Sequence, residues 1–442
     1  MKFFKRLAGF AFTALFFAGL YFICDYLGAN AKSFYMDTPG KTVTGSIDFS
    51  KTSVDRLVEN YVNNELERDI VLTAAGDMKF YEWQLRRAYD EAAQAFDFSP
   101  SFEYITKYVE TDDYAVGDIE TTLAGANNGT DTQYYGYGAD KKAKLFNTPE
   151  IVAKNLKDAG FDMITTANEH ALDSGAAGLT NTLDELTAAG LTAVGTRKSA
   201  EDATYTIESV KGLNIGFIAY TNIMTNTEDE EALSLVNHLD NYDEAKITKM
   251  CGQIREMRAK GAEAVVVMLH FGAEYASAPD DAASQLAHQL IDAGADVILG
   301  SHTHVPGTIE VVNAKNSDGT YRKGLVLYSL GNFLTSQQYV DGSGQNRDMG
   351  MLCDIIFKKG KDGVRVGGIN ITPVYSNWTD TAVATVPVTE AYDNPEAFGD
   401  IFDDIAKSRI KNAYENIFPE LMQNSGLIYT YEDYKYKISI EK

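Results

Sequence analysis

The chain has 442 residues, 45% of them hydrophobic, and a formal net charge of −24 at pH 7. Its length predicts one large domain with additions, and its apolar content is sufficient for a packed core. The negative charge would repel a polyanion and no basic run offsets it, so nucleic acid is excluded as a partner. The three cysteines, Cys24, Cys251 and Cys353, predict neither a disulfide framework nor a thiolate metal site.

The first segment, 1–31, has the features of a membrane anchor. Three cations among its first six residues precede an uncharged run from Leu7 to Cys24, which is long enough to cross a bilayer core of about 30 Å. This charge pattern predicts a single-pass protein of the cell membrane with an extracytoplasmic body. The alternative is a cleaved signal peptide and a secreted body, because Ala29 and Ala31 form a small-x-small pattern.

The next two regions differ in composition. Residues 32–66 mix polar and charged side chains with few long apolar runs, so we expect a stalk or linker. The main domain, 67–385, begins with the apolar stretch "DIVLTAAGD", a predicted buried strand. Further predicted strands are "FDMITTA", "LNIGFIAY", "AEAVVVMLHFG" and "ADVILG".

Predicted helices fall between these strands. One of them has Thr148 as its predicted N-cap and Gly160 as its stop. The others cover 176–189, 244–260 and 281–293. This alternation is typical of an α/β fold.

The last part of the main domain lacks the alternation of strands and helices. The segments "MLCDIIF", "VRVGGINITPVYS" and "AVATVPVT" follow one another without a helix between them. They predict antiparallel strands that complete or edge the sheet structure. The remaining segment, 386–442, predicts a helical C-terminal appendage of unknown role.

Polar residues gather where the predicted strands end. In open α/β sheets, functional groups lie in the crevice at the carboxyl ends of the strands, and four of the six histidines fall at such positions. Nitrogen and oxygen ligands without a thiolate suit Mn, Zn or Fe. Two such ions can activate a bridging water and clamp the oxygens of a displacement at phosphorus. Asp118 is the candidate bridging ligand.

Six motifs in order carry a family resemblance. They are "AAGDMKF", "GDIETT", "TANEHALDSG", "MLHFGAEY", "GSHTHVPG" and "YSLGNF". This series, from 69 to 340, resembles that of the CapA-type poly-γ-glutamate capsule synthesis proteins, which belong to the calcineurin-like metallophosphoesterase superfamily. The resemblance implies an α/β fold, a metallophosphoesterase-like β-sandwich flanked by helices, with a site at one end for one or two divalent transition metal ions.

The resemblance also implies roles for the acidic residues. Asp77 matches the ligand after the first strand, Asp118 the carboxylate that bridges two ions, and Glu120 an acidic residue that the family adds nearby. Glu169 stands where the superfamily usually has a ligand asparagine, and Asn168 precedes it, so either is a candidate ligand. For Glu120, acceptance of backbone hydrogen bonds is an alternative role.

The histidines receive two kinds of role from the same resemblance. His170 matches the histidine that assists the leaving group, and Asp173 is a candidate to orient it or, equally, a helix cap. The remaining imidazole ligands are His270, His302 and His304.

One position departs from the superfamily pattern. Two residues after Asp77 the superfamily has a histidine, whereas this chain has Lys79. A protonated lysine cannot ligate a metal, and its charge opposes a second cation. The extra charge of Glu169 is a candidate compensation, and both one ion and two ions are open.

Three functional hypotheses follow. The first is a metal-dependent hydrolase or transferase acting on an anionic envelope polymer or a phosphoester. The second is an accessory subunit that binds or exports poly-γ-glutamate or a related polymer beside a membrane synthase. The third is a scaffold without a site, which the clustered charges argue against. Catalysis therefore stays undecided between the first two.

Overall fold

The computed structural model describes residues 67–110, 113–126, 134, 136–137, 144–225, 229–315, 319–338 and 345–440. The predicted membrane anchor and the stalk lie outside the described residues. Within the described ranges, no helix combines the length and apolar character needed to cross a membrane. The chain divides into two compact units, and the larger one, Asp69–Lys359 with Gly363–Lys442, contains the elements that matter here.

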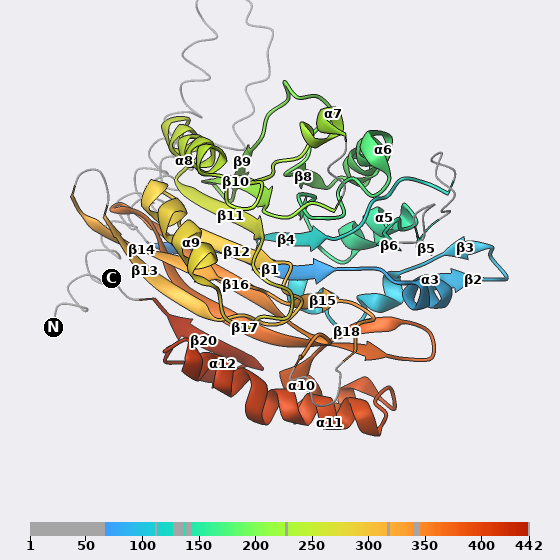
Figure 1. The fold of residues 1–442 in the computed structure, drawn as a ribbon. Helices are drawn as coiled ribbons and strands as arrows, with labels where there is room; N and C mark the ends of the chain where they lie inside the picture. The colour runs from blue at the N-terminus through green and yellow to red at the C-terminus, as the bar shows by residue number, and fades with distance from the viewer. Residues whose placement is uncertain are drawn as a thin grey trace, which may run out of the picture. The chain divides into compact units, whose positions relative to one another are not determined.

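A ten-stranded mixed sheet forms one layer of this unit (Figure 1). Its parallel strands lie in the order β1 (Arg68–Met78), β4 (Tyr114–Ile119), β7 (Met163–Thr165) and β8 (Thr192–Val194). On the other side of β1 follow β16 (Met349–Gly360), β17 (Gly363–Trp378), β20 (Lys435–Ser439) and β19 (Thr430–Glu432). Two further strands pair off this path, β15 (Asn332–Leu334) with β1 and β18 (Val383–Pro387) with β17.

A six-stranded sheet forms the second layer. Its parallel strands are β10 (Leu213–Thr221), β11 (Ala264–His270), β12 (Val297–Ser301) and β14 (Tyr321–Leu327). The antiparallel strands β9 (Thr206–Val210) and β13 (Ile309–Lys315) form its two edges. Two small hairpins lie apart from both sheets, β2 (Tyr89–Asp90) with β3 (Ala95–Phe96) and β5 (Gly136–Tyr137) with β6 (Lys144–Leu145).

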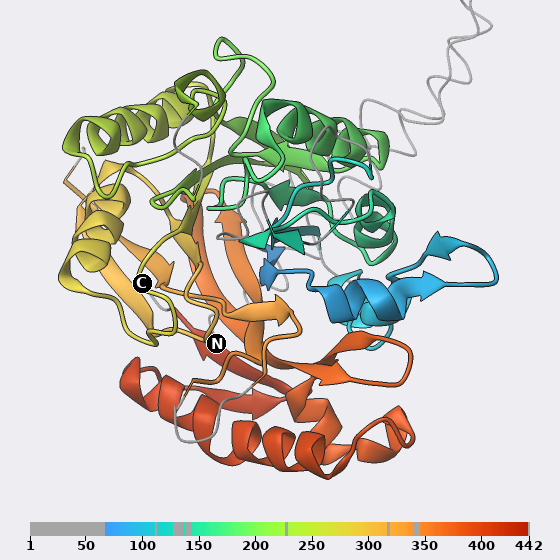
Figure 2. The same cartoon turned by 45° about the vertical axis from the view of Figure 1, so that its right-hand side comes forward.

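Helices cover the outer face of each sheet. The helices α5 (Ile151–Asp158) and α6 (Gly175–Ala188) lie on the ten-stranded sheet, and α8 (Glu244–Ala259) and α9 (Asp281–Ala293) lie on the six-stranded sheet (Figures 1 and 2). Shorter helices are α3 (Glu82–Ala88), α4 (Thr106–Val109) and α7 (Glu230–Leu233). The prediction of an α/β sandwich flanked by helices is confirmed.

The strand β11 shows why its sequence reads as a continuous apolar run. All seven of its residues are buried, and successive side chains of a strand point to opposite faces. Val266 and Met268 enter the core between the two sheets, whereas Val265 and Val267 pack against α8 and α9. A parallel strand covered on both faces needs apolar residues at every position.

The C-terminal segment 386–442 combines helices with strands. It contains α10 (Val388–Asp393), α11 (Asp404–Asn412) and α12 (Phe418–Asn424), and it also supplies β19 and β20 to the ten-stranded sheet. Apolar side chains of its helices, such as Phe398 and Phe418, join the same core cluster that lies between the two sheets. The red helices in Figure 2 therefore pack on the sandwich through shared apolar contacts.

One predicted helix start is wrong. The helix α5 begins at Ile151 with Glu150 as its N-cap residue, so Thr148 lies before the helix. The Thr148 hydroxyl instead lies 2.9 Å from the Thr121 hydroxyl, while its backbone N–H donates to the Thr122 carbonyl. These contacts to the segment after β4 hold Thr148 in place of a capping hydrogen bond.

Candidate metal centre

The carboxyl ends of strands from both sheets meet at one place. Asp77 on β1 lies beside Asp118 on β4, and in the second sheet His270 at the end of β11 lies beside Ser301 at the end of β12. The remaining predicted residues follow β4, β7 and β12 within a few positions. Most of them are linked by the contacts described below.

A glycine permits the close approach of β1 and β15. A Cβ atom at Gly76 would lie 2.0 Å from the Gly331 carbonyl oxygen, so no other residue fits without a backbone shift. The approach allows the Asp77 N–H to donate to Gly331, and it places Asn332 opposite Asp77 in the ladder. The motifs "AAGD" and "LGN" are thus tied together by one backbone contact.

Asp77, Glu120 and His304, the carboxylate-rich group, form the first set of possible ligands. All three are 0% exposed. Asp77 Oδ2 lies 3.3 Å and Glu120 Oε2 lies 3.7 Å from His304 Nδ1. Asp77 Oδ1, Glu120 Oε2 and His304 Nε2 find no hydrogen-bond partner within the described part of the chain. Buried polar atoms without partners are destabilising, and a divalent cation would satisfy them.

Glu169, His270 and His302, the imidazole-rich group, form the second set. Glu169 Oε2 lies 3.0 Å from His302 Nδ1 and 3.9 Å from His270 Nε2, and the two imidazole nitrogens are 3.2 Å apart. Ligands placed tetrahedrally about a zinc ion are separated by about 3.3 Å, given metal–nitrogen distances of about 2.0–2.1 Å. The three atoms are therefore spaced as ligands of one ion would be.

Asp118 lies between these groups. Together with Asp77 and His270 it forms a third possible ligand set. Its Oδ2 accepts a hydrogen bond from the Ser301 hydroxyl at 2.9 Å and lies 3.1 Å from His270 Nδ1. Asp118 thus lies beside Asp77 of the carboxylate-rich group and contacts His270 of the imidazole-rich group, and its role as a bridging ligand stays a prediction.

Lys79 occupies a fourth group of possible ligands. Its ammonium group forms a buried ion pair with Glu120 Oε1, and it lies 3.2 Å from His170 Nε2 and 4.0 Å from Glu169 Oε1. Glu120, Glu169 and His170 are spaced closely enough to hold a metal, but a lysine cation is already among them. The direct partner of Lys79 is Glu120, and Glu169 is the more distant one.

His170 and Asp173 interact as the sequence led us to expect. His170 Nδ1 lies 2.7 Å from Asp173 Oδ2, and His170 Nε2 lies 3.2 Å from Glu169 Oε1. Asp173 also accepts a hydrogen bond from the Phe146 backbone N–H at 2.7 Å. The N-cap of α6 is Ser174, so the alternative helix-cap role of Asp173 is wrong and its contacts are those of an orienting group.

Asn168 plays a different part from Glu169. Its side-chain amide donates to the Ile119 carbonyl at 2.7 Å and to Asp118 Oδ1 at 3.3 Å. Its Oδ1 accepts from the His170 backbone N–H. These bonds hold the turn after β7 against β4, while Glu169 reaches the two imidazoles.

Burial and neighbouring charge shift the pKa values in the centre. Burial, reinforced by the Glu120 charge, raises the pKa of Asp118 to about 7. Burial opposes ionisation of Glu120, but the Lys79 ammonium outweighs it and lowers the pKa of Glu120 to about 2. Burial lowers the pKa of His270 to about 4. The raised pKa of Asp118 reflects burial beside another carboxylate, which a divalent cation would relieve.

The pKa of His170 shifts in the opposite direction from the pKa of His270. Burial and the Lys79 charge lower its pKa, but the hydrogen bonds to Asp173 and Glu169 outweigh both and raise the pKa of His170 to about 9. An imidazole with a raised pKa carries a proton at neutral pH. His170 is thus suited to donate a proton.

The backbone is strained where it presents the histidines. His302 and His304 have φ values of 88° and 61°, and Tyr275 in the neighbouring loop has a φ of 64°. Non-glycine residues rarely adopt such conformations, and those that do cluster at functional sites. The Tyr275 N–H donates to the Thr303 carbonyl at 2.7 Å, which joins the two strained loops.

Sequence reasoning assigned no role to several residues around the centre. The side-chain oxygen of Asn332 lies 3.1 Å from His304 Nδ1, which leaves His304 Nε2 free to ligate. Its presence in the quoted motif "YSLGNF" was a usable signal. Ser301 in "GSHTHVPG" and Tyr275 in "MLHFGAEY" offered the same signal and were also missed. Arg347 lies outside the quoted motifs, and its contact with Tyr275 depends on loops that approach only in the folded chain.

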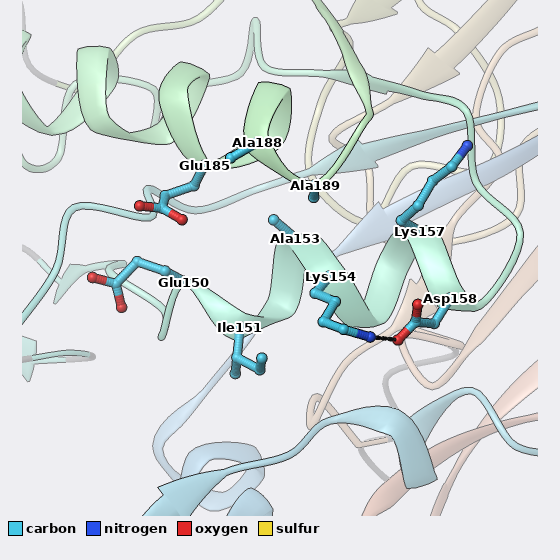
Figure 3. A pocket seen from close by; sticks show the side chains of 9 residues that line it. All are labelled: Glu150, Ile151, Ala153, Lys154, Lys157, Asp158, Glu185, Ala188 and Ala189. Carbon is cyan, nitrogen blue, oxygen red and sulfur yellow. Dashed lines mark hydrogen bonds and ion pairs between the residues drawn. The ribbon is translucent and has the colours of Figure 1, made fainter.

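The remaining histidines and a groove between α5 and α6 lie elsewhere. His238 pairs with Asp240, and His288 lies 3.0 Å from Glu310. A groove of about 500 Å³ between α5 and α6 is lined by charged and apolar side chains, with an ion pair between Lys154 and Asp158 (Figure 3). None of its lining residues belongs to the candidate centre.

The fold and the site together define a class of protein. It is a two-sheet α/β protein whose strand ends hold buried carboxylates and imidazoles suited to a divalent metal. Residues 71–337 match the family model of the bacterial capsule synthesis protein PGA_cap. The chain belongs to this family, which confirms the resemblance found in the sequence.

Individual relatives share about two thirds of this chain or less. It is 32% identical over 275 residues to the PGA biosynthesis protein CapA of Bacillus subtilis (strain 168), covering 62% of this chain and 64% of that protein. It is 28% identical over 282 residues to the capsule biosynthesis protein CapA of Bacillus anthracis, covering 62% of each. The chain therefore spans somewhat less than two thirds of these relatives.

Two more distant similarities were found. A probable polyglutamine synthesis accessory protein of Mycobacterium tuberculosis (strain ATCC 25618 / H37Rv) is 29% identical over 187 residues, covering 40% of this chain and 46% of that protein. Among solved structures, the calcineurin-like phosphoesterase YfkN of Bacillus subtilis aligns with a TM-score of 0.40 and 13% identity. That alignment covers 82% of this chain and 100% of the other.

Proposed function

We propose that this protein is a metal-dependent hydrolase or transferase that takes part in synthesis of poly-γ-glutamate or a related anionic surface polymer. The observation that carries the proposal is the carboxylate-rich group, whose three buried ligand atoms make no hydrogen bond within the described chain. The printed names of two relatives refer to PGA and capsule biosynthesis, which supports the choice of polymer.

The residues of the centre divide the chemical work. The two ligand groups would hold one or two ions of Mn, Zn or Fe, which supply Lewis acidity and activate water. Asp118 forms a further possible ligand set with one member of each group, Asp77 and His270. Lys79 holds Glu120 by an ion pair, so one carboxylate oxygen stays directed at the carboxylate-rich group while the other is neutralised.

His170 is proposed as the proton donor. Asp173 fixes its Nδ1, so the ring presents Nε2 toward Glu169 and the centre. A proton delivered from Nε2 to the leaving oxygen or nitrogen would accelerate bond cleavage by about 10²- to 10⁴-fold. The raised pKa of His170, about 9, supplies that proton at neutral pH.

A second candidate function is a non-catalytic accessory subunit beside a membrane synthase. The mycobacterial relative is named a probable accessory protein of polymer synthesis, which favours this candidate. In this case the same centre would hold a structural ion, and polymer production would depend on the protein without any turnover by it.

The location proposed is the outer face of the cell membrane, with the N-terminal segment as anchor. The cations that precede the apolar run from Leu7 to Cys24 support it. Protease added to protoplasts should degrade the body of the protein. Complete protection until the cells are lysed would reverse the orientation.

Comparison of His170→Ala with His302→Ala tests the enzymatic proposal. Purified full-length protein would be loaded with Mn²⁺ and assayed on poly-γ-glutamate and on a chromogenic phosphodiester. We expect His170→Ala to keep its metal but lose about 10²- to 10⁴-fold in turnover, because only the proton donor is removed. His302→Ala should lose metal as well as turnover, since it removes a ligand.

The outcomes separate the two candidates. Loss of polymer production in cells with no turnover by the wild-type protein on either substrate would favour the accessory subunit. Equal loss of metal in both variants would make His170 a ligand and place the proton donor elsewhere.

A further inference from the structure

Arg347 is held beside the candidate centre by its backbone. Its carbonyl accepts a hydrogen bond from the Asn332 side chain at 2.7 Å, and the same Asn332 contacts His304 through its oxygen. The next residue, Asp348, forms a buried two-pronged ion pair with Arg409 on α11. The backbone at Arg347 is therefore fixed, and the Asn332 side chain links it to His304, a predicted ligand.

The guanidinium group of Arg347 lies over an aromatic ring and pairs with no carboxylate of the described residues. Its centre lies 4.5 Å from the centroid of the Tyr275 ring, and its Nε is buried and makes no hydrogen bond to any described residue. None of the carboxylates in the described ranges forms an ion pair with it. Its recorded partner is the Tyr275 side chain, and a partly buried guanidinium with an unused Nε donor would bind an anion supplied from outside the chain favourably.

Tyr275 links that guanidinium to the loop of the candidate centre. The strained backbone of Tyr275 is fixed by its hydrogen bond to the Thr303 carbonyl. The Tyr275 ring lies 6.0 Å from the His304 ring, centroid to centroid. The tyrosine is thus in contact distance of both the cation and the loop that carries His302 and His304.

We propose that Arg347, stacked on Tyr275, binds a carboxylate of the substrate next to the reacting bond. The inference rests on the proposed function, since it takes the substrate to be an anionic polymer. A γ-linked glutamate chain carries one free carboxylate on every residue, and a guanidinium matches a carboxylate with two parallel hydrogen bonds. Arg347 is then a specificity-determining residue for repeating carboxylates, distinct from the metal ligands.

Binding of charged and uncharged oligomers tests the proposal. Dissociation constants of the Mn²⁺-loaded full-length protein would be measured for a fluorescent γ-linked glutamate decamer and for the same decamer with its free carboxylates amidated. We expect Arg347→Gln to bind the charged decamer about 10- to 100-fold more weakly, the loss of one charge-assisted hydrogen-bond pair. Arg347→Lys should recover only part of that loss, because an ammonium cannot bind in two-pronged fashion.

The control is Arg86→Gln. Arg86 is an exposed arginine on α3 that also lies over an aromatic ring, Trp83, but it pairs with Glu82. It should bind the charged decamer as tightly as the wild type. A phosphodiester competitor tests whether Arg347 binds phosphate instead of carboxylate. If the phosphodiester displaces the decamer equally well from the wild type and from Arg347→Gln, Arg347 does not bind the phosphate, and a carboxylate subsite is supported.

Two sets of results would contradict the proposals. If Arg347→Gln binds the charged decamer as the wild type does, or weakens both decamers equally, the proposed subsite is wrong while the proposed function stands. If the wild-type protein binds neither decamer and cleaves neither polymer nor phosphodiester, the proposed function itself fails. Metal content measured on the same samples shows that any loss of binding does not arise from loss of the ion.

Discussion

The two ligand groups of the centre differ in charge and in how their atoms are satisfied. The carboxylate-rich group has two carboxylates and one imidazole, and one atom of each residue makes no hydrogen bond within the described chain. The imidazole-rich group has one carboxylate and two imidazoles, whose atoms already contact each other at 3.0–3.9 Å. The first group therefore depends on a cation more strongly than the second.

Lys79 reduces the difference in charge between the carboxylate-rich group and the imidazole-rich group. Its ammonium neutralises one oxygen of Glu120 but leaves the other directed at the carboxylate-rich group. The ion pair therefore leaves Glu120 with one oxygen available to a cation, despite the lysine at position 79. A lysine beside these carboxylates is compatible with a cation site, because it pairs with only one oxygen of Glu120.

The largest expected effect comes from Lys79→Met. The substitution leaves Glu120 buried without its partner, and breaking a buried ion pair from one side destabilises a protein by about 3–5 kcal/mol. We expect the metal-free variant to unfold at a clearly lower denaturant concentration than the wild type. Addition of Mn²⁺ should recover more stability in the variant than in the wild type, because the ion then neutralises Glu120.

A surface lysine provides the control. Lys154 pairs with Asp158 on the exposed side of α5, and exposed pairs contribute at most about 1 kcal/mol. Lys154→Met should therefore change the unfolding midpoint little and leave its response to Mn²⁺ unchanged. A Lys79→Met variant as stable as this control would show that Glu120 does not rely on Lys79.

The next effect in size comes from Asn332→Ala. Asn332 contacts His304 Nδ1 and leaves Nε2 without a hydrogen-bond partner in the described chain, and loss of such a partner typically lowers metal affinity by about 10- to 100-fold. We expect weaker Mn²⁺ binding in a titration that follows free Mn²⁺ by its magnetic resonance signal. The imidazole-rich group lacks this contact, so its share of the binding should persist.

Asn377→Ala is the matched control for this substitution. Asn377 is also a buried asparagine, and its amide donates to the Ile401 carbonyl on the side of the C-terminal helices. Its loss should affect stability without affecting Mn²⁺ affinity. Equal affinity in Asn332→Ala and the wild type would mean that His304 is oriented by its strained backbone alone.

The sequence predicted the fold class and the place of the site because both depend on local patterns. Apolar runs such as 264–270 are read directly as buried strands, and polar residues at their ends must then share one edge of the sheets. The roles of Asp173 and Lys79 could only be narrowed to alternatives. They depend on distances of a few ångströms between separate strands, which no spacing along the chain records.

Other parts of the site could not be predicted from the sequence at all. Arg347 and Tyr275 lie in loops without periodicity, and they meet only because Asn332 and Thr303 tie those loops together. The choice of Asn168 or Glu169 as the ligand likewise depends on contacts between separate segments of the chain. Asn168 contacts Ile119 and His170, whereas Glu169 contacts the two imidazoles, and spacing along the chain records neither set of contacts.

The smallest expected effect on Mn²⁺ binding comes from Ser301→Ala. This substitution alters the surroundings of Asp118, the carboxylate between the two groups. The Ser301 hydroxyl donates to Asp118 and lowers its pKa, although burial still raises that pKa to about 7. Without the hydroxyl, the pKa of Asp118 should rise further. A metal binds only the ionised carboxylate, so affinity for Mn²⁺ should fall below the raised pKa and return to the wild-type value above it.

Dissociation constants for Mn²⁺ measured from pH 6 to pH 9 should show this shift. We expect Ser301→Ala to bind about three- to tenfold more weakly at pH 6, as for the loss of one hydrogen bond, and nearly as tightly as the wild type at pH 9. Titration of the histidine ligands is common to both proteins, so the difference between the two curves reports on Asp118. Ser329→Ala is the control, because Ser329 is also a buried serine but accepts a hydrogen bond from the Gly331 N–H. A loss of affinity that is the same at every pH would mean that Ser301 positions Asp118 without tuning its ionisation, and the bridging position would then depend on geometry alone.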